Sequence, residues 1–277
     1  MSWGWPGSFL QKTPTTTDAL RVDLNADIGE SFGMFRMGSD EMLMQSITSG
    51  SVACGFHAGD PSVMRRTVRL AAKAGVAIGA HPGFPDLAGF GRREMKIDPQ
   101  DIFDMVLYQL GALSGMAKAE GVSLRHVKPH GALYNMAARQ RDVAETVARA
   151  VGAFDDTLLL IGLPGSELLA AGERIGLRVA AEGFADRSYE PDGSLTPRHL
   201  ADSVLSEPGR AAERAVRMVR HGKVAARDGS TLSLHVDTIC IHGDTPDAGG
   251  LAAAVRLALE QAGITVTSGG SDKTRPT

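Results

Sequence analysis

The chain has 277 residues, of which 43% are hydrophobic and 22% charged, a balance that is ordinary for a globular protein with a sizeable core. Its formal net charge of -3 and its scattered Lys and Arg residues argue against a nucleic acid partner. No apolar run approaches the roughly 18 residues that a membrane span requires, so no membrane partner is expected. Cys54 and Cys240 lie within apolar runs, which favours buried free thiols and a cytoplasmic location.

The two ends of the chain differ in composition from the rest. Residues 1–19 contain Gly, Pro and Thr but lack the basic start and apolar stretch of a signal peptide, so they are predicted to form a disordered N-terminal arm. Residues 268–277 are polar and are predicted to form a disordered tail. The remaining residues, 20–267, are expected to form one catalytic domain.

Seven strand patterns alternate with longer helical segments along this domain, a spacing that predicts βα units and a parallel sheet. The strands are expected at about 20–26, 51–56, 76–80, 124–129, 157–162, 177–182 and 234–241. No linker-like change in composition interrupts them, so the predicted fold is α/β, a single (β/α) barrel that is seven-stranded and distorted. An open doubly wound sheet is the alternative, but no G-x-G-x-x-G motif follows the first strand.

Several helices are marked by a polar residue followed by proline. Asp60-Pro61 predicts the start of a helix that ends at Gly75. The pairs Asp98-Pro99, Thr196-Pro197 and Thr245-Pro246 predict three further helix starts. Residues 185–198 contain a Pro-Asp-Gly turn and are expected to form a hairpin or lid over the edge of the sheet.

Polar clusters follow the strand patterns, beginning with DLNADIGE at 23–30. Strand alternation places Asn25 and Asp27 on the same face as Asp23, where they would point into the mouth of a barrel. Packing does not explain inward polar groups, so Asn25 and Asp27 are predicted site residues. Glu30 is either a site residue or part of a turn held by hydrogen bonds to the backbone.

His57 and His81 follow the second and third strand patterns, with Asp60 and Asp86 close by. Asp27, His57 and His81 could together bind a divalent metal ion that activates water. No H-E-x-x-H or C-x-x-C motif is present, so hydrogen bonding to substrate or proton transfer is the favoured interpretation of the two histidines. For Asp60, helix capping is the strong alternative.

In VKPHGALYN at 127–135, Lys128 and His130 are expected to face one side, with Tyr134 and Asn135 a helical turn beyond. A lysine within a strand is costly unless its ammonium reaches water or an anion, which suggests a carboxylate or phosphate ligand. His126 is assigned to the opposite face and to a structural or surface role. The later strand ends add a final set of candidate substrate-binding residues: Glu182, Asp186, Arg187, Tyr189, His242 and Asp244.

The sequence lacks the motifs that are typical of several reaction classes. The chain contains no G-x-x-x-x-G-K-[ST] phosphate loop and no G-x-S-x-G elbow, and neither cysteine lies where a thiolate would be stabilised. Water activated by a carboxylate, a histidine or a metal ion is therefore expected, rather than an acyl-enzyme.

Six ordered motifs carry a family resemblance: D-L-N-x-D-x-G-E at 23–30, A-C-G-F-H-A-G-D-P at 53–61, G-x-H-P-x-x-P-D at 79–86, V-K-P-H-G-A-L-Y-N at 127–135, E-G-F-A-D-R-x-Y at 182–189 and I-H-G-D at 241–244. The chain resembles the LamB/YcsF family from about residue 20 to 267. The resemblance implies a seven-stranded barrel like those of polysaccharide deacetylases and related glycoside hydrolases. It also implies the role of the A component of a 5-oxoprolinase, which opens 5-oxo-L-proline to L-glutamate with ATP as co-substrate, together with separate B and C subunits.

Residue chemistry then suggests roles within that reaction. Asp27 or His57 would activate water, and Lys128 or Arg187 would hold the substrate carboxylate or a phosphate, with His81 and His130 as proton donors or oxyanion stabilisers. Without a phosphate loop, ATP is expected on partner subunits or at an interface. The alternatives are a stand-alone metal-dependent hydrolase such as a deacetylase, and a non-catalytic protein that binds a lactam or sugar.

Overall fold

The structure is a computed structural model that describes residues 20–245 and 247–269. The predicted N-terminal arm at 1–19, residues 270–277 of the predicted tail and Pro246 lie outside the described residues. The arm and most of the tail therefore stay predictions.

Seven parallel strands form a closed barrel, as the sequence predicts. The first strand, β1, pairs with β2 on one side and with β9 on the other, which closes the sheet and rules out the open alternative. An eighth strand, β10 (Thr265–Val266), lies outside the ring and pairs with the start of β1. The barrel strands are β1 (Arg21–Ile28), β2 (Ser49–Ala53), β3 (Ala77–His81), β4 (Leu124–Val127), β5 (Leu159–Gly162), β6 (Arg178–Phe184) and β9 (Thr238–Ile241).

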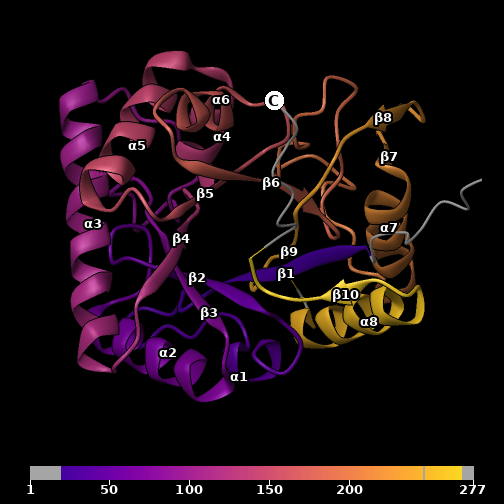
Figure 1. Cartoon of the computed structure of the whole chain (residues 1–277), viewed down its shortest axis with the longest axis horizontal. Helices are drawn as coiled ribbons and strands as arrows, with labels where there is room; N and C mark the ends of the chain where they lie inside the picture. Colours follow the sequence, from indigo (N-terminus) through magenta and orange to yellow (C-terminus); the bar gives the residue numbers. More distant parts are fainter. Residues whose placement is uncertain (1–19, 246, 270–277) are drawn as a thin grey trace, which may run out of the picture.

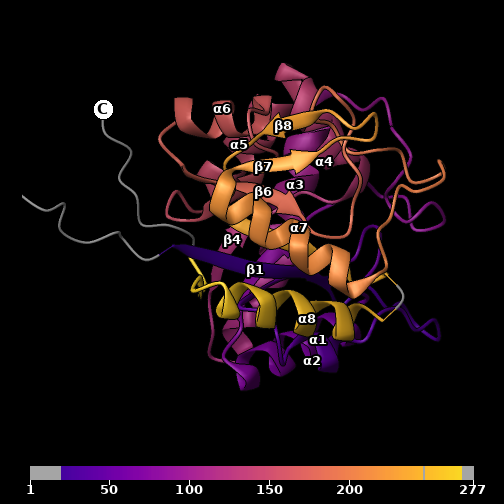
Figure 2. The same ribbon diagram turned by 90° about the vertical axis from the view of Figure 1, so that its right-hand side faces the viewer.

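Helices form the outer layer of the barrel (Figure 1). Figure 2 shows α7 and α8 side by side across β1. No helix in the described part of the chain combines the length and apolar character needed to cross a bilayer. The helices are α1 (Asp40–Leu43), α2 (Pro61–Ala74), α3 (Pro99–Ala119), α4 (Gly131–Arg139), α5 (Arg141–Phe154), α6 (Glu167–Arg174), α7 (Pro208–His221) and α8 (Ala248–Gln261).

Alternation along β1 divides its side chains between the two layers. Leu24, Ala26 and Ile28 belong to the buried apolar core between strands and helices. Asn25 and Asp27 alternate with them and make polar contacts inside the barrel. The barrel is therefore apolar on its outer face and polar within at this strand, which is the arrangement that a site at the carboxyl ends of the strands requires.

Strand register stacks the inward residues of neighbouring strands in layers. Asp23 is level with Thr238, and the next inward residue, Asn25, is level with Cys240. On the other side of β1, Asp27 is level with Ser51. The polar residues of β1 thus meet polar partners at each layer toward the carboxyl end.

The capping signals around α2 are confirmed. The Asp60 carboxylate accepts hydrogen bonds from the backbone N–H groups of Ser62 and Val63, and Pro61 is the first helical residue. Gly75 ends the helix in the left-handed region at φ 70°. Local sequence alone sets both ends of this helix.

Two other expectations about helix starts need correction. No helix follows Thr196-Pro197, because the backbone carbonyl of Thr196 accepts a hydrogen bond from Arg187, and the N–H of Thr196 is bonded to Ser188. The cap of α8 is Asp247 rather than Thr245, since the Asp247 side chain accepts from Gly250 N–H.

The predicted hairpin within 185–198 is present, with Tyr189 bridged to Leu195. A second hairpin, β7 (Lys223–Ala225) with β8 (Thr231–Ser233), was not predicted. The last predicted barrel strand, 234–241, begins only at Thr238, because the residues before it connect back from β8.

Candidate active site

A buried lysine lies at the carboxyl ends of the barrel strands. Lys128 follows β4, and its side chain is only 2% exposed. Its Nζ is 2.6 Å from Asp27 Oδ1 and 3.0 Å from Glu182 Oε1, and it donates to Asn25 Oδ1 at 2.9 Å. Asp27 and Asn25 come from β1 and Glu182 from β6, so closure of the barrel is what brings these groups to the lysine.

The positive charge of Lys128 and the negative charges of the neighbouring carboxylates stabilise one another. Burial opposes the charge of Lys128, but Asp27 and Glu182 hold the pKa of the lysine well above its ordinary value. Burial also opposes the charge of Asp27, but His81 and Lys128 hold the pKa of this carboxyl well below its ordinary value. An ammonium and a carboxylate therefore face each other at the base of the site.

Further hydrogen bonds fix the position of Glu182. Asn25 Nδ2 donates to Glu182 Oε1 at 3.0 Å and to Thr238 Oγ1 at 2.7 Å. The hydroxyl of Tyr134, on α4, donates to Glu182 Oε2 at 2.9 Å. Both carboxylate oxygens of Glu182 are thus bonded, which holds the lysine and its partners in one geometry.

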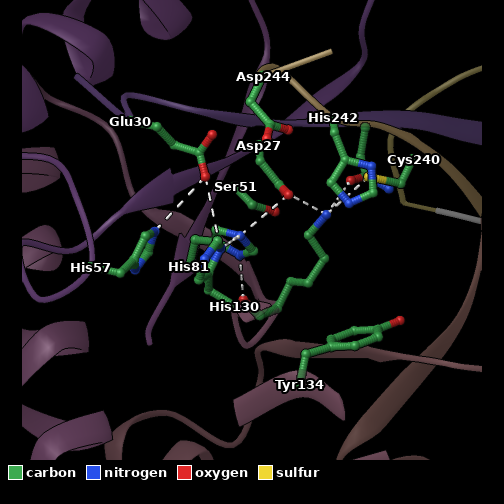
Figure 3. Close-up of polar contacts among 12 residues, drawn as sticks. Asp27, Glu30, Ser51, His57, His81, His130, Tyr134, Cys240, His242 and Asp244 are labelled. Carbon is green, nitrogen blue, oxygen red and sulfur yellow. Dashed lines mark hydrogen bonds and ion pairs between the residues drawn. The ribbon is translucent and has the colours of Figure 1, made fainter. Parts of the chain in front are cut away.

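Three histidines from neighbouring strand ends lie together beside Asp27 (Figure 3). His81 Nε2 is 3.3 Å from Asp27 Oδ2 and 2.9 Å from His130 Nδ1. The rings of His57 and His130 are stacked with centroids 3.7 Å apart. Glu30 Oε1 is 3.9 Å from His57 Nε2 and 3.7 Å from His130 Nδ1.

Burial makes Glu30, His57 and His130 prefer their neutral forms. Burial and the neighbouring histidines lower the pKa of His57 well below its ordinary value, and burial with the proximity of His81 does the same to the pKa of His130. Burial and the Asp27 charge raise the pKa of Glu30 well above its ordinary value. Neutral imidazoles offer lone pairs to a proton, a substrate or a metal ion.

Two groups among the described residues have ligand atoms close enough to hold a metal ion: Glu30, His57, His81 and His130, and separately Asp27, Cys240 and His242. In the second group, Lys128 Nζ lies 3.2 Å from Cys240 Sγ and 2.6 Å from Asp27 Oδ1. An ammonium in that place would repel a cation. The Glu30 group is the better metal site of the two.

Asp186 and His242 form a separate pair of interacting side chains just after the ends of β6 and β9. The Asp186 carboxylate accepts hydrogen bonds from the backbone N–H of His242 at 3.1 Å and from Thr245 Oγ1 at 2.8 Å, and it contacts His242 Nδ1 at 3.1 Å. Burial opposes the charge of Asp186, but His242 and these hydrogen bonds lower the pKa of Asp186. The pair orients the His242 ring, which stacks on Phe184.

Arginines surround Asp244 at the rim. Arg92 Nη2 and Arg198 Nη1 lie 2.6 Å and 3.1 Å from Asp244 Oδ2, and both guanidinium groups are partly exposed. Arg187 is buried and donates to the backbone carbonyls of Ser203 and Thr196. Burial and the nearby Arg198 lower the pKa of Arg187 to about 10. Arg92 and Arg198 are therefore the guanidinium groups that a ligand at the rim would reach.

The structure brings most of the predicted site residues together. Direct contacts connect Asn25, Asp27, Glu30, His57, His81, Lys128, His130, Tyr134 and Glu182, and beside them lie Asp186, Arg187, His242 and Asp244.

Four predicted residues lie outside this group. Asp60 caps α2, and Asp86 pairs with Arg93. Asn135 is exposed on α4, and the buried Tyr189 hydroxyl accepts a hydrogen bond from Phe184 N–H.

Other residues of the site are absent from the sequence predictions. Cys240 contacts Lys128, and alternation from His242 along β9 could have placed it in the interior. Arg92 and Arg198 lie in irregular segments, so no periodicity marks them. The assignment of His126 to the opposite face is wrong, because residues two apart share a face; His126 points inward below Lys128, with Nε2 3.0 Å from Ser51 Oγ.

A closed parallel barrel with its charged groups gathered at the carboxyl ends of the strands defines an enzyme of the (β/α) barrel class. Within that class, the chain belongs to the LamB/YcsF family, whose family model matches residues 22–273. The family resemblance of the six motifs is confirmed.

Curated relatives and a solved structure agree with this assignment. The chain is 55% identical over 246 residues to the 5-oxoprolinase A component of Bacillus licheniformis, covering 89% of this chain and 97% of the relative. It is 53% identical over 249 residues to the 5-oxoprolinase A component of Bacillus subtilis, covering 90% and 97%. The crystal structure of a lactam utilization protein from Thermus thermophilus has a TM-score of 0.85 and 51% identity, covering 90% of this chain and 100% of that chain.

Proposed function

We propose that the protein is the A component of an ATP-dependent 5-oxoprolinase, which opens the lactam of 5-oxo-L-proline to L-glutamate together with B and C subunits. The observation that carries the proposal is the buried contact of Lys128 with Asp27, Asn25 and Glu182, in a chain that is 55% identical over 246 residues to a relative of that name. These residues place the positive charge of Lys128, a carboxylate that can act as a base and hydrogen-bonding side chains close together.

The chemistry explains why ATP is required. A lactam is a resonance-stabilised amide that water attacks poorly. Phosphorylation of its carbonyl oxygen makes the ring carbon electrophilic and turns the oxygen into part of a leaving group. The balanced reaction consumes ATP, 5-oxoproline and two water molecules, and it yields ADP, phosphate and glutamate. The ring C–N bond breaks and its nitrogen takes up a proton.

Residue roles follow from charge and position. Asp27 is the carboxylate placed to accept a proton from the attacking water, because its lowered pKa keeps it ionised and it faces His81. Lys128 stabilises negative charge that develops on the carbonyl oxygen of the lactam. Arg92 and Arg198 at the rim are suited to the substrate carboxylate or to a phosphoryl group. His81 and His130 would serve as proton donors where no metal ion occupies the histidine group.

The location of ATP is part of the same proposal. No phosphate loop is present in the sequence, so ATP binds on a partner protein or at an interface with one, and the protein alone is inactive. Cys54 and Cys240 are free and buried, which suits a reducing cytoplasm.

Reconstitution tests the function. The protein is mixed with B and C subunits, 5-oxoproline and ATP, and glutamate and phosphate are measured with each component omitted in turn. We expect both products in equal amounts only when all components are present. Glutamate formed without ATP and partners would instead favour a stand-alone metal-dependent hydrolase, for which the histidine group is the supporting observation.

The non-catalytic alternative is tested by Asp27→Asn in the same complex. A protein that only binds a lactam or sugar would bind 5-oxoproline yet leave turnover unchanged by this substitution. The proposed function predicts loss of turnover with the complex still assembled. Near-normal turnover of the variant would remove Asp27 from the chemistry.

A further inference from the structure

Four buried side chains place their ligand atoms close together beside the Asp27–Lys128 pair. Glu30, His57, His81 and His130 come from the ends of the first four barrel strands, and their ligand atoms all lie within 4.8 Å of one another. Figure 3 shows Glu30 facing the three imidazole rings.

Backbone carbonyls fix the orientation of two of the rings. His81 Nδ1 lies 2.7 Å from the carbonyl oxygen of Lys128, and His130 Nε2 lies 2.7 Å from that of Phe90. A carbonyl only accepts, so each of these nitrogens carries a proton and donates it. In the neutral rings the lone pairs are then on His81 Nε2 and His130 Nδ1, which face each other at 2.9 Å.

Two lone pairs in that position require a cation between or beside them. Metal-binding histidines in general donate their second ring N–H to a carbonyl or carboxylate, which directs the other nitrogen at the metal. Both His81 and His130 have this pattern. A single shared proton would also join the pair, but it would leave the other two members of the group without a ligand.

The surroundings of His57 decide between a metal ion and a shared proton as the occupant of this group. It is completely buried, and neither of its ring nitrogens has a hydrogen-bond partner within the described structure. Buried polar atoms without a partner are rare and call for a missing ligand. A proton shared between His81 and His130 would leave the ring nitrogens of His57 without a partner, whereas a metal ion would be within reach of all four side chains.

The separations fit a compact site. Tetrahedral coordination with metal–ligand distances of ~2.0–2.1 Å sets ligand atoms about 3.3 Å apart. The observed separations are 2.9 Å between His81 and His130, 3.7 Å between His130 and Glu30, and 3.9 Å between His57 and Glu30. All separations among the four ligand atoms are within 4.8 Å, so closing the set around an ion requires the side chains to move together.

We propose that Glu30, His57, His81 and His130 bind one divalent metal ion of the zinc class. Three imidazoles and one carboxylate are the donors that zinc and its neighbours among the transition metals prefer, and magnesium and calcium prefer oxygen. Asp27 is not counted among the ligands, because its Oδ1 pairs with Lys128 and its close potential ligand partners are Cys240 and His242. The binding of the ion does not depend on the proposed function. Its use in lactam opening, where it would polarise the carbonyl or activate water, rests on that function.

Metal binding is tested without substrate, ATP or partners. The full-length protein is treated with a chelator and titrated with Zn²⁺ by calorimetry, with metal content measured by mass spectrometry and the Co²⁺ form examined by visible absorption. We expect one equivalent per chain and a four-coordinate Co²⁺ spectrum. Removing a ligand in His57→Asn or His130→Asn is expected to weaken binding by about 100-fold or more.

His126→Gln is the matched control, because it removes a buried histidine outside the group. It should bind Zn²⁺ like the unmodified protein. Glu30→Gln, which keeps the side-chain shape, decides the question if a histidine variant does not fold by circular dichroism. Absence of stoichiometric binding, or equal binding by the ligand variants, would overturn the proposal in favour of a shared proton. A metal-free protein that still supports reconstituted turnover would leave the proposed function intact, and failed reconstitution would leave the metal site intact.

Discussion

Lys128 is the residue on which the rest of the site depends. Its ammonium is shielded from water and contacts the carboxylates of Asp27 and Glu182 at 2.6 Å and 3.0 Å. Such a group is stable only as a whole, because removal of the cation leaves two buried carboxylates without a counter-charge. Stability and chemistry are therefore both expected to depend on this one side chain.

Lys128→Met tests this dependence. We expect the free energy of unfolding to fall by about 3–5 kcal/mol, because the carboxylates lose their partner. Turnover of the reconstituted complex should fall about 100-fold or more at a temperature where the variant is still folded. Urea unfolding and the coupled glutamate assay measure the two effects.

The control for this prediction is Lys118→Met, at an exposed lysine in the last turn of α3. Its unfolding free energy should change by less than about 0.5 kcal/mol. Near-normal turnover of folded Lys128→Met protein would show that the lysine is structural only.

Strand periodicity predicts individual site residues well where a strand continues into the site. Alternation alone places Asn25, Asp27 and Lys128 inside the barrel, and the structure puts them in mutual contact. The error at His126 came from misapplying the same rule. Arg92 is out of reach of any such rule, because a loop brings it to Asp244 across a sequence separation of 152 residues.

At the scale of elements, α2 has the strongest local signals. The Asp60 carboxylate bonds two N–H groups of its first turn and also accepts from Gly33 N–H at 2.8 Å, which ties the loop after β1 to the helix. α3 begins with the same Asp-Pro pair, yet the side chain of Asp98 makes no capping hydrogen bond.

This contrast gives a matched prediction. Asp60→Ala should lower the free energy of unfolding by about 1 kcal/mol, because N–H groups lose their acceptor. Asp98→Ala should change it by less than about 0.5 kcal/mol. Chemical denaturation of both variants measures the difference, and equal losses would mean that the capping bonds contribute nothing measurable.

The ends of a helix were predictable where residues that are adjacent in sequence determine them. The sequence around Asp60 and Gly75 contains its own start and stop signals, and the helix follows them. Thr196-Pro197 has the same pattern of a polar residue before proline, but Arg187 and Ser188 bond the backbone of Thr196 and hold the segment in a hairpin. Tertiary hydrogen bonds of this kind leave no local pattern to detect.

For the whole molecule, one buried histidine links stability to pH. His126 lies inside the barrel, and burial, with help from Lys128 on its own segment and His81 on β3, lowers the pKa of His126 to about 3; Asp27 on β1 opposes this shift. In the unfolded chain, His126 would bind a proton near pH 6.5. The contribution of His126 to the free energy of unfolding is therefore complete above that pH and is lost as the pH falls toward 3.

Comparison with His126→Gln isolates this effect. Between about pH 7.5 and pH 5 the unmodified protein should lose about 2 kcal/mol more unfolding free energy than the variant. Denaturation at the two pH values measures it. Parallel pH dependence of the two proteins would mean that His126 binds a proton as readily in the folded state as in the unfolded state.

Closure of the barrel was predictable from seven strand patterns without a break in composition, but the contacts across the closing seam were not. β1 and β9 pair across more than 200 residues of sequence, with Asn25 level with Cys240. No local signal specifies such a register, and it follows only when every strand has taken its place.

The short strand β10 has a consequence for how the chain could be rearranged. Thr265 N–H donates to the Leu20 carbonyl at 2.8 Å, and Thr267 N–H donates to the Val22 carbonyl at 2.9 Å. The first and last strands of the described structure therefore start side by side, at the edge of the barrel opposite Lys128 and the histidines. A short linker could join residue 267 to residue 20, and the covalent ring could be opened in the exposed β7–β8 turn. Such a circular permutant would cut no barrel strand, and the opened turn would lie next to Tyr189, which Ala226 and Arg227 contact.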